Sequence, residues 1–232
     1  MLRQRILAGV VVVCVAGLMM GCSKKDNPVA PPERTVLFTE GFEGDLSNWR
    51  DNYMINIGDF YPQMRISTDA ARTGTHSITS DSNRCALLYY VDPRVETGIV
   101  GGEFYIMATA AGQTNFTVEI GQNAGSSGGL GKAFGFGFDQ TDSVKCTFYD
   151  SWTGPNDTMI SALQLNHWYK CVVEVDFTAQ TITYYLEGAK VRTRPLPTQE
   201  MYGIDRVLVF RGIMGAEGPT SYFADDIVLY KK

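Results

Sequence analysis

The chain contains few histidines, and this scarcity limits its chemistry. Its 232 residues include two, His76 and His167, and none of its five cysteines has the spacing of a zinc site. The sequence therefore argues against a histidine-based metal site and against a lyase centre. A basic patch and known nucleic-acid-binding motifs are also missing, which excludes nucleic acid as a partner.

Helical periodicity is absent as well. No long segment places apolar residues at the 3.6-residue spacing of an amphipathic helix. Short apolar or alternating runs recur about every eight to fifteen residues, separated by Gly, Asn, Asp and Ser, which predicts an all-β sandwich or barrel with one core. The predicted strands are Val36–Thr39, Met54–Ile57, Met64–Ser67, His76–Thr79, Ala86–Val91, Ile99–Ala108, Asn115–Ile120, Lys132–Phe138, Val144–Tyr149, Tyr169–Phe177, Thr181–Leu186, Arg206–Arg211 and Tyr222–Tyr230.

The N-terminus carries an apolar run that is too short for a comfortable membrane span. Ile6–Met20 has about fifteen residues, whereas a spanning helix needs about twenty. The run ends in the letters LMMGC at Cys22, which resemble a bacterial lipobox with Met19 in place of the usual Leu. The resemblance implies a lipoprotein signal peptide over residues 1–21, cleaved before a lipidated Cys22. The alternative is an ordinary secretory signal or an uncleaved anchor.

Residues 22–35 are rich in proline, small residues and charges, which predicts a flexible tether to a domain over residues 36–232. Ser23 resembles an outer-membrane sorting signal, which implies a place in the bacterial cell envelope on its periplasmic or surface side. The lipid anchor is then the only membrane attachment. Without the signal peptide, 18 basic residues stand against 25 acidic ones, a formal charge of −7. The sequence does not set the oligomeric state.

Three cysteines belong to the domain, Cys85, Cys146 and Cys171, an odd number for an oxidising compartment. Cys146 and Cys171 each alternate with apolar neighbours, so both are predicted to point into the core as small hydrophobic side chains. A disulfide stays open as the alternative.

A β-hairpin is the clearest pattern of the domain. In HWYKCVVEVDFTAQTITYYLEGAKV, from His167 to Val191, side chains alternate between two faces, TITYYL returns as a strand, and Gly188 allows a turn with positive φ. This pattern resembles the concanavalin A-like lectin and glucanase superfamily, especially its laminin-G-like branch. The segments FTEGFEGDLSNW, DAARTGTHSITS and YFADDIVLY resemble the same family. The resemblance implies a two-sheet antiparallel jelly-roll sandwich, in which Trp49 and Trp168 pack the fold.

The resemblance also implies a structural calcium ion. In such sandwiches the first and last strands lie close together, which would bring Glu40 or Glu43 near Asp225 or Asp226. Carboxylates and turn carbonyls suit Ca²⁺, which takes six to eight oxygen ligands. Asp225 alternates with apolar residues, so we expect it on the core face, where a carboxylate needs a partner. The alternative is that these aspartates cap backbone amides or pair with an arginine.

Two acids of the hairpin, Glu174 and Asp176, resemble the start of the Glu-x-Asp-x-Glu strand of laminarinase-type glucanases. Retaining hydrolysis needs two carboxyl groups about 5–5.5 Å apart. The third acid is missing, because Thr178 stands at its position. We therefore interpret the pair as solvated outward charges. Another pair, such as Glu103 and Glu119 on neighbouring outward faces, stays open.

Aromatic residues in turn-rich segments predict a sugar-binding surface, because sugars stack on aromatic faces while amides and carboxylates bond their hydroxyls. Outward strand positions such as Lys145 and Thr147 could form its floor. The alternatives are that Trp152 folds back to plug its loop and that the strand positions form an ordinary solvated face. The candidate ligand-binding residues are Trp152, Tyr149, Asp150, Asn156, Tyr61 and Arg65.

The sequence thus predicts a cell-envelope lipoprotein whose domain binds a carbohydrate or another surface without catalysis. Two alternatives stay open. One is a polysaccharide-degrading enzyme of the same fold, either a glycoside hydrolase or a lyase. The other is a structural or adhesion domain without a small ligand.

Overall fold

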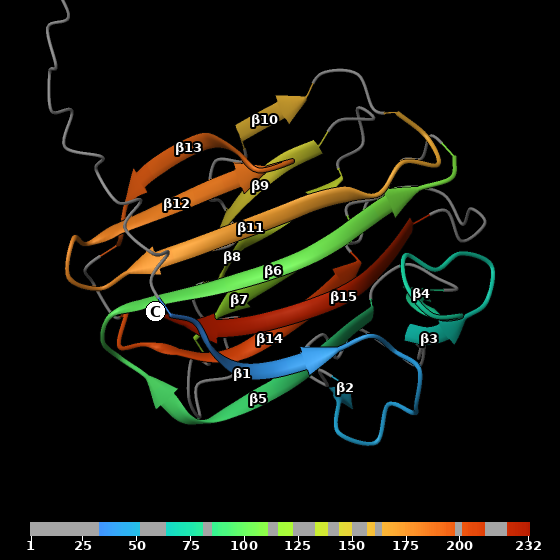
Figure 1. The fold of residues 1–232 in the computed structure, drawn as a ribbon, viewed down its shortest axis with the longest axis horizontal. Helices are drawn as coiled ribbons and strands as arrows, with labels where there is room; N and C mark the ends of the chain where they lie inside the picture. Colours follow the sequence, from blue (N-terminus) through green and yellow to red (C-terminus); the bar gives the residue numbers. More distant parts are fainter. Residues whose placement is uncertain are drawn as a thin grey trace, which may run out of the picture. The chain divides into compact units, whose positions relative to one another are not determined.

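The structure is a computed structural model, and it describes residues 33–51, 64–80, 85–110, 116–122, 133–138, 144–149, 157–160, 164–197, 201–211 and 222–232. All regular secondary structure in these ranges is β-strand, and the strands form two antiparallel sheets (Figure 1). No helix in the same ranges is long and apolar enough to cross a membrane.

The first sheet has eight strands. Its order is β13-β12-β11-β6-β15-β4-β3, and β1 also pairs with β15. β6 follows one edge of β15 along its length, while β1 and β4 share the other edge (Figure 1). The strands are β1 (Thr35–Glu40), β3 (Met64–Ser67), β4 (Ser77–Ser80), β6 (Ile99–Ala108), β11 (Tyr169–Asp176), β12 (Thr181–Leu186), β13 (Ala189–Pro195) and β15 (Tyr222–Lys231).

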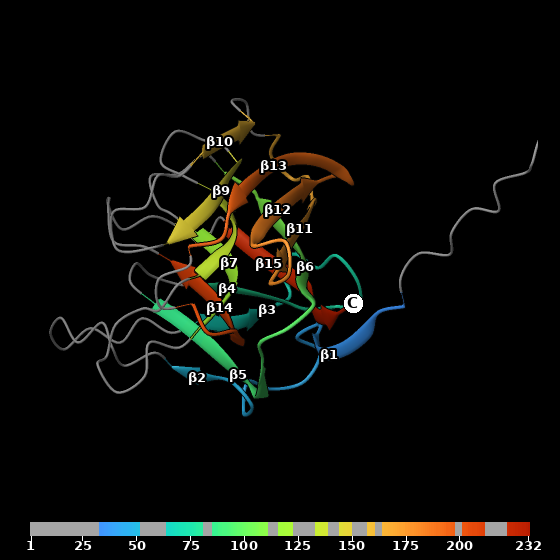
Figure 2. The same cartoon turned by 90° about the vertical axis from the view of Figure 1, so that its left-hand side faces the viewer.

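The second sheet has seven strands in the order β10-β9-β8-β7-β14-β5-β2. Figure 2 shows it edge-on as a separate layer, to the left of the eight-stranded sheet. The strands are β2 (Arg50–Asp51), β5 (Cys85–Val95), β7 (Phe116–Gly121), β8 (Ala133–Phe138), β9 (Val144–Tyr149), β10 (Asp157–Ile160) and β14 (Ile204–Arg211).

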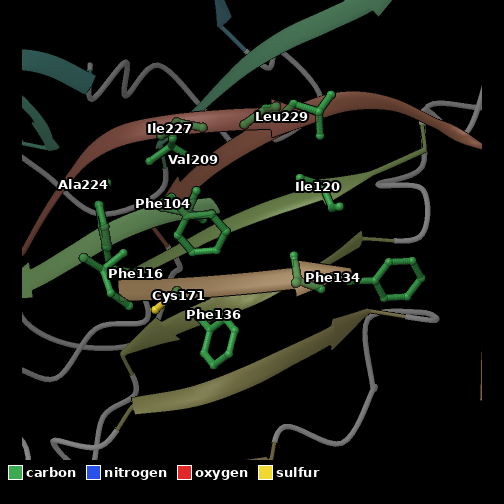
Figure 3. Packing of buried hydrophobic residues seen from close by; sticks show 14 of the residues in the cluster. Phe104, Phe116, Ile120, Phe134, Phe136, Cys171, Val209, Ala224, Ile227 and Leu229 are labelled. Atoms are coloured by element: carbon green, nitrogen blue, oxygen red, sulfur yellow. The ribbon is translucent and has the colours of Figure 1, made fainter. Parts of the chain in front are cut away.

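The hydrophobic core lies between the two sheets, because alternate side chains of each strand point to the same interior. Gly102 of β6 brings the sheets close together, since a Cβ at this position would lie 2.6 Å from the side chain of Ile120. The core is drawn in Figure 3, with Phe104, Cys171, Ala224, Ile227 and Leu229 from the eight-stranded sheet and Phe116, Ile120, Phe134, Phe136 and Val209 from the seven-stranded sheet.

The predicted jelly-roll sandwich is confirmed, and the predicted bounds of β3, β6, β9 and β12 are those observed. The predicted strand Met54–Ile57 lies outside the described residues. β13 was not predicted, because its sequence AKVRTRP is polar and ends in proline. These are features of an edge strand, where charges and proline prevent pairing with another chain.

Two predictions about the core have mixed outcomes. Trp49 is buried and packs against Phe38 and Phe42, as predicted, whereas Trp168 is only half-buried and lies outside the core cluster. Cys85 and Cys171 are buried thiols that form no disulfide with one another. The side chain of Cys146 lies outside the described residues, as does Cys22.

Candidate functional site

The outer face of the seven-stranded sheet carries polar side chains that strand alternation keeps out of the core. On β7, Phe116, Val118 and Ile120 enter the core. Thr117 and Glu119, which alternate with them, therefore point away from it. β7 thus supplies one hydroxyl and one carboxyl group to this outer face.

Two cations join them from neighbouring strands. Lys145 of β9 stands opposite Gly137 of β8, which in turn stands opposite Thr117. Arg206 of β14 stands opposite Gly121, at the end of β7. Because directly paired residues of an antiparallel sheet share a face, both cations lie on the outer face. A small apolar cluster of Ala86, Leu88 and Leu208, separate from the main core, lies on the same face.

These polar residues are not solvated, although they face away from the core. Thr117 is 0% exposed, Glu119 and Arg206 are 2% exposed, and Lys145 is 6% exposed. Burial lowers the pKa of Arg206, and the charge of Glu119 acts in the opposite direction. The Thr117 hydroxyl is buried without a hydrogen-bond partner in the structure. These side chains therefore form a buried polar cluster on the outer side of the sheet and not an ordinary solvated sheet face.

Two glycines shape the same surface. On β8, core-facing Phe134, Phe136 and Phe138 alternate with Gly135 and Gly137, so the outward positions carry no side chain. A Cβ at Gly135 would lie 1.9 Å from the carbonyl oxygen of Val118, and one at Gly137 would lie 2.3 Å from that of Phe116. Glycine is therefore required here by the close approach of the neighbouring strand.

The predicted ligand-binding residues are only partly placed. By its register, Tyr149 occupies the same face of β9 as Lys145, although its side chain lies outside the described residues. Arg65 belongs to β3 of the other sheet and is not brought to this face. Four further candidates lie outside the described residues, namely Trp152, Asp150, Asn156 and Tyr61.

The acids of the hairpin have structural partners. Glu174 is 8% exposed, so the prediction that it is a solvated charge is wrong. It accepts a hydrogen bond of 2.6 Å from the hydroxyl of Tyr230 and pairs with Lys232 at 2.5 Å. Asp176 accepts the backbone N–H groups of Thr178 and Ala179, both at 2.8 Å, and so caps the turn.

The other predicted pair of acids, Glu103 and Glu119, does not lie together. Glu103 lies in β6 of the eight-stranded sheet and Glu119 in β7 of the seven-stranded sheet. Both point outwards, but from opposite sides of the sandwich, so the expectation of neighbouring outward faces is wrong.

The predicted metal residues gather where the ends of the domain meet. β1 pairs with β15, with Glu40 opposite Ile227, as the resemblance implied. Glu40 accepts hydrogen bonds from the backbone N–H of Phe42 at 2.7 Å and the indole N–H of Trp49 at 3.1 Å. Glu43 makes four hydrogen bonds of 2.8 to 3.1 Å with the connection between β3 and β4. The pKa of Glu43 is thereby lowered to about 2, chiefly by the side chain of His76.

Asp225 lies on the outer face of the sheet, so the expectation that it faces the core is wrong. It stands opposite Tyr105 of β6, whose sequence neighbours both point into the core. The register with β6 shifts just after Asp225, and Asp226 has a φ of 49°, so Ile227 resumes the core face. This β-bulge adds one residue to β15, so the residues before and after it alternate in opposite phase. Alternation along the sequence alone does not reveal such a residue.

The two aspartates also accept hydrogen bonds from protein donors. Asp225 accepts the backbone N–H groups of Arg72 at 2.8 Å and of Asp226 at 2.7 Å. Asp226 accepts hydrogen bonds from the Arg72 guanidinium at 2.8 Å and from the Thr73 hydroxyl at 2.6 Å. Each oxygen of the four predicted carboxylates therefore faces a donor. Among the described residues no group of three or more His, Cys, Asp or Glu side chains is arranged to hold a metal ion. This arrangement does not fit a calcium ion.

A hollow of about 460 Å³ lies elsewhere, at the edge between the sheets. None of the polar residues that line it is buried, and one of its charges, Arg94, pairs with Asp205 at 2.8 Å. It therefore lacks the sheltered polar groups of the outer face of the seven-stranded sheet. The lining residues are Leu37, Val91, Asp92, Pro93, Arg94, Val95, Glu96, Thr97 and Lys231.

Sequence reasoning considered Glu119 only as half of a wrong pair, and it did not consider Thr117 or Arg206. The alternation FTVEIG does place Thr117 and Glu119 opposite the apolar face. The neighbouring AFGFGF, with glycine at each outward position, was the signal that this face is unusual. The assignment of each strand to a sheet, which the sequence does not contain, was needed to combine the two signals.

Comparison with known proteins shows the fold. No protein-family model matches the chain, and no curated protein sequence matches it significantly. A conserved carbohydrate esterase from the Shiga toxin-encoding bacteriophage phi24B is similar with a TM-score of 0.58 and 14% identity, over 86% of this chain and 100% of that one.

Two further solved structures are similar over most of both chains. A structure described with the endo-acting O-glycanases of prominent human gut microbiota has a TM-score of 0.59 and 9% identity, over 85% of this chain and 100% of that one. The Bacillus licheniformis β-glucanase has a TM-score of 0.56 and 13% identity, over 84% and 97%. The chain therefore has the concanavalin A-like jelly-roll fold.

Proposed function

We propose that this protein is a carbohydrate-binding β-sandwich without catalysis, and that its ligand lies on the outer face of the seven-stranded sheet. The observation that carries the proposal is the sheltered polar set of Thr117, Glu119, Lys145 and Arg206 beside two bare glycines. A carbohydrate is recognised by such a set because hydroxyls, carboxylates and cations all bond sugar hydroxyls. The carbohydrate-related descriptions of the similar structures support this ligand class.

β7 by itself does not supply the two carboxyl groups of a glycosidase. Glu119 is the carboxyl group that β7 presents, because the positions two residues away on the same face are Thr117 and Gly121. Retaining and inverting glycosidases both need a second carboxyl group at a defined distance. A strand with one carboxyl group is suited to ligand recognition, in which Glu119 would accept hydrogen bonds from the hydroxyl groups of the sugar.

A glycan array on the full-length protein tests the proposal. We expect retention of at least one glycan class, and Thr117→Val and Glu119→Gln should each weaken binding about tenfold or more, which corresponds to about 1.4 kcal/mol. Glu103→Gln, on the other sheet, is the matched control and should bind as the wild type does. Absence of retention, or equal loss in the control, would contradict the proposal. Hydrolysis of a bound glycan that disappears in Glu119→Gln would favour the enzyme.

We also propose that Cys22 anchors the protein in a bacterial envelope, on the support of the sequence pattern around it. Replacement Cys22→Ser should then move the protein from the membrane fraction to the soluble fraction. Unchanged fractionation would contradict the anchor and leave the glycan-binding proposal untouched.

A further inference from the structure

The segment Arg72–His76 connects β3 to β4 and contacts both groups of carboxylates at the junction of the chain ends. Its first two residues bond Asp225 and Asp226. Its last two bond Glu43, which follows β1. Gly74 lies between them with a φ of 62°, and a Cβ there would lie 2.2 Å from a carboxylate oxygen of Glu43. The segment therefore contacts Glu43 after β1 and the two aspartates of β15 at the same time.

Arg72 is the cation of this junction. Its guanidinium donates to Asp226 at 2.8 Å, and its backbone N–H donates to the fully buried Asp225. The guanidinium carbon also lies 3.7 Å from the ring centroid of Tyr105, on the adjoining strand β6. The hydrogen bond to Asp226 raises the pKa of Arg72, so its charge is fixed at every physiological pH.

The junction needs a positive charge at this point. Asp225 and Asp226 are adjacent in the sequence, at the place where the partner of β15 changes from β4 to β1. Two adjacent carboxylates at a strand junction are costly unless they are paired. In many proteins a calcium ion with six to eight oxygen ligands meets such a need, but the oxygens here already face donors.

We propose that the guanidinium of Arg72 takes the role of a structural cation at this junction, so that the domain joins its chain ends without a divalent metal. A planar guanidinium suits the role because it can bond a carboxylate and stack on an aromatic ring at the same time. The joined ends are β1 and β15, and β4 is held against the same edge of β15.

Thermal melts of the full-length protein test the proposal. The wild type should melt at the same temperature in excess EDTA and in millimolar Ca²⁺, whereas a well-saturated calcium site would add roughly 5–10 °C. Arg72→Met should lower the melting temperature by about 5 °C, and Arg72→Lys by less, because lysine keeps the charge but not the planar geometry. Arg65→Met is the matched control. The Arg65 guanidinium lies 3.4 Å from a carboxylate oxygen of Asp69 and does not contact Asp225 or Asp226, so its replacement should change the melting temperature little.

A double-mutant cycle separates the role of Arg72 from general destabilisation. Arg72→Met and Asp226→Asn should together lower the melting temperature by less than the sum of their separate effects, since both remove the same contact. Additive effects would overturn the proposal, as would a Ca²⁺-dependent rise in the wild type. If Arg72→Met does not fold, the chelator comparison and Arg72→Lys still decide the matter.

Discussion

The outer faces of the two sheets differ in how they handle charge. On the eight-stranded sheet, the charged groups around Glu103 lie near the solvent and pair with one another, whereas Glu174 and Asp225 of the same outer face are buried against protein donors. Glu103 contacts Lys170 at 2.7 Å and Arg34 at 3.3 Å, and Arg34 also lies 4.2 Å above the ring of Tyr230. On the seven-stranded sheet the polar residues are 0 to 6% exposed and stand beside glycines.

The comparison shows that outward-facing and solvent-facing are different properties of a strand position. Alternation fixes which side of a sheet a residue occupies, and it does so equally well in both sheets. On the eight-stranded sheet Glu103 pairs with the exposed cations Lys170 and Arg34, whereas on the seven-stranded sheet Glu119 lies in a buried polar cluster with Arg206. This difference is why we place the ligand on the seven-stranded sheet.

The glycines offer the largest expected effect on this comparison. At Gly135 an added Cβ would meet the backbone of Val118, whereas at Gly101 it would lie 2.2 Å from the ring of Tyr230, a side chain that can yield only by disturbing its hydrogen bond to Glu174. Gly135→Ala should therefore destabilise the protein by about 3 kcal/mol or more, and Gly101→Ala by about 1–2 kcal/mol. Urea unfolding of both variants measures this difference.

The ranking of the two glycine variants is what matters. Equal costs would mean that β8 can shift away from β7 as easily as Tyr230 can turn. The close approach of β7 to Gly135 and Gly137, where no side chain stands, would then not be a rigid feature of the seven-stranded sheet. The proposed binding face would lose its structural basis.

The sequence predicts much of the fold and little of the site, for identifiable reasons. The bounds of β6 and β9 follow from uninterrupted alternation. The bulge at Asp226 does not, because one extra residue reverses the faces that alternation assigns. The burial of Glu174 likewise depends on Tyr230, which covers Gly101 and comes from a strand 56 residues away in the sequence.

Asp225 is where the outer face of the eight-stranded sheet becomes buried, and its pH dependence should show this. Burial raises its pKa from 3.8 to about 6, against the opposing effect of the Arg72 N–H and the Asp226 N–H. The folded state then binds the proton more tightly than the unfolded state. The free energy of unfolding should therefore rise as the pH falls from about 6 towards 4. It should fall again as the pH rises to about 6, because Asp225 is then charged in its buried position.

Replacing Asp225 with Asn isolates this effect. The groups that face Asp225 are the backbone N–H groups of Arg72, Thr73 and Asp226, the carboxylate of Asp226, and Tyr105, and the replacement leaves all of them unchanged. The stability difference between wild type and Asp225→Asn should change by on the order of 1–3 kcal/mol between pH 4.5 and 6. Glu43, with its pKa lowered to about 2, affects stability only below about pH 4.5. Parallel pH profiles of the two proteins would show that Asp225 is not buried as a charge.

The smallest expected effect concerns the solvent-side charges of the eight-stranded sheet. The side chains of Glu103, Lys170 and Arg34 are 19%, 37% and 46% exposed, so water and salt reach their contacts. Glu103→Gln should cost about 0.5 kcal/mol, and high salt should remove most of that cost. Glu119→Gln on the seven-stranded sheet should change stability by an amount that salt hardly alters, because screening acts weakly on buried groups. Unfolding curves at low and high salt compare the two replacements directly. If both respond to salt alike, the two outer faces are equally solvated, and the distinction on which the proposed ligand face rests is removed.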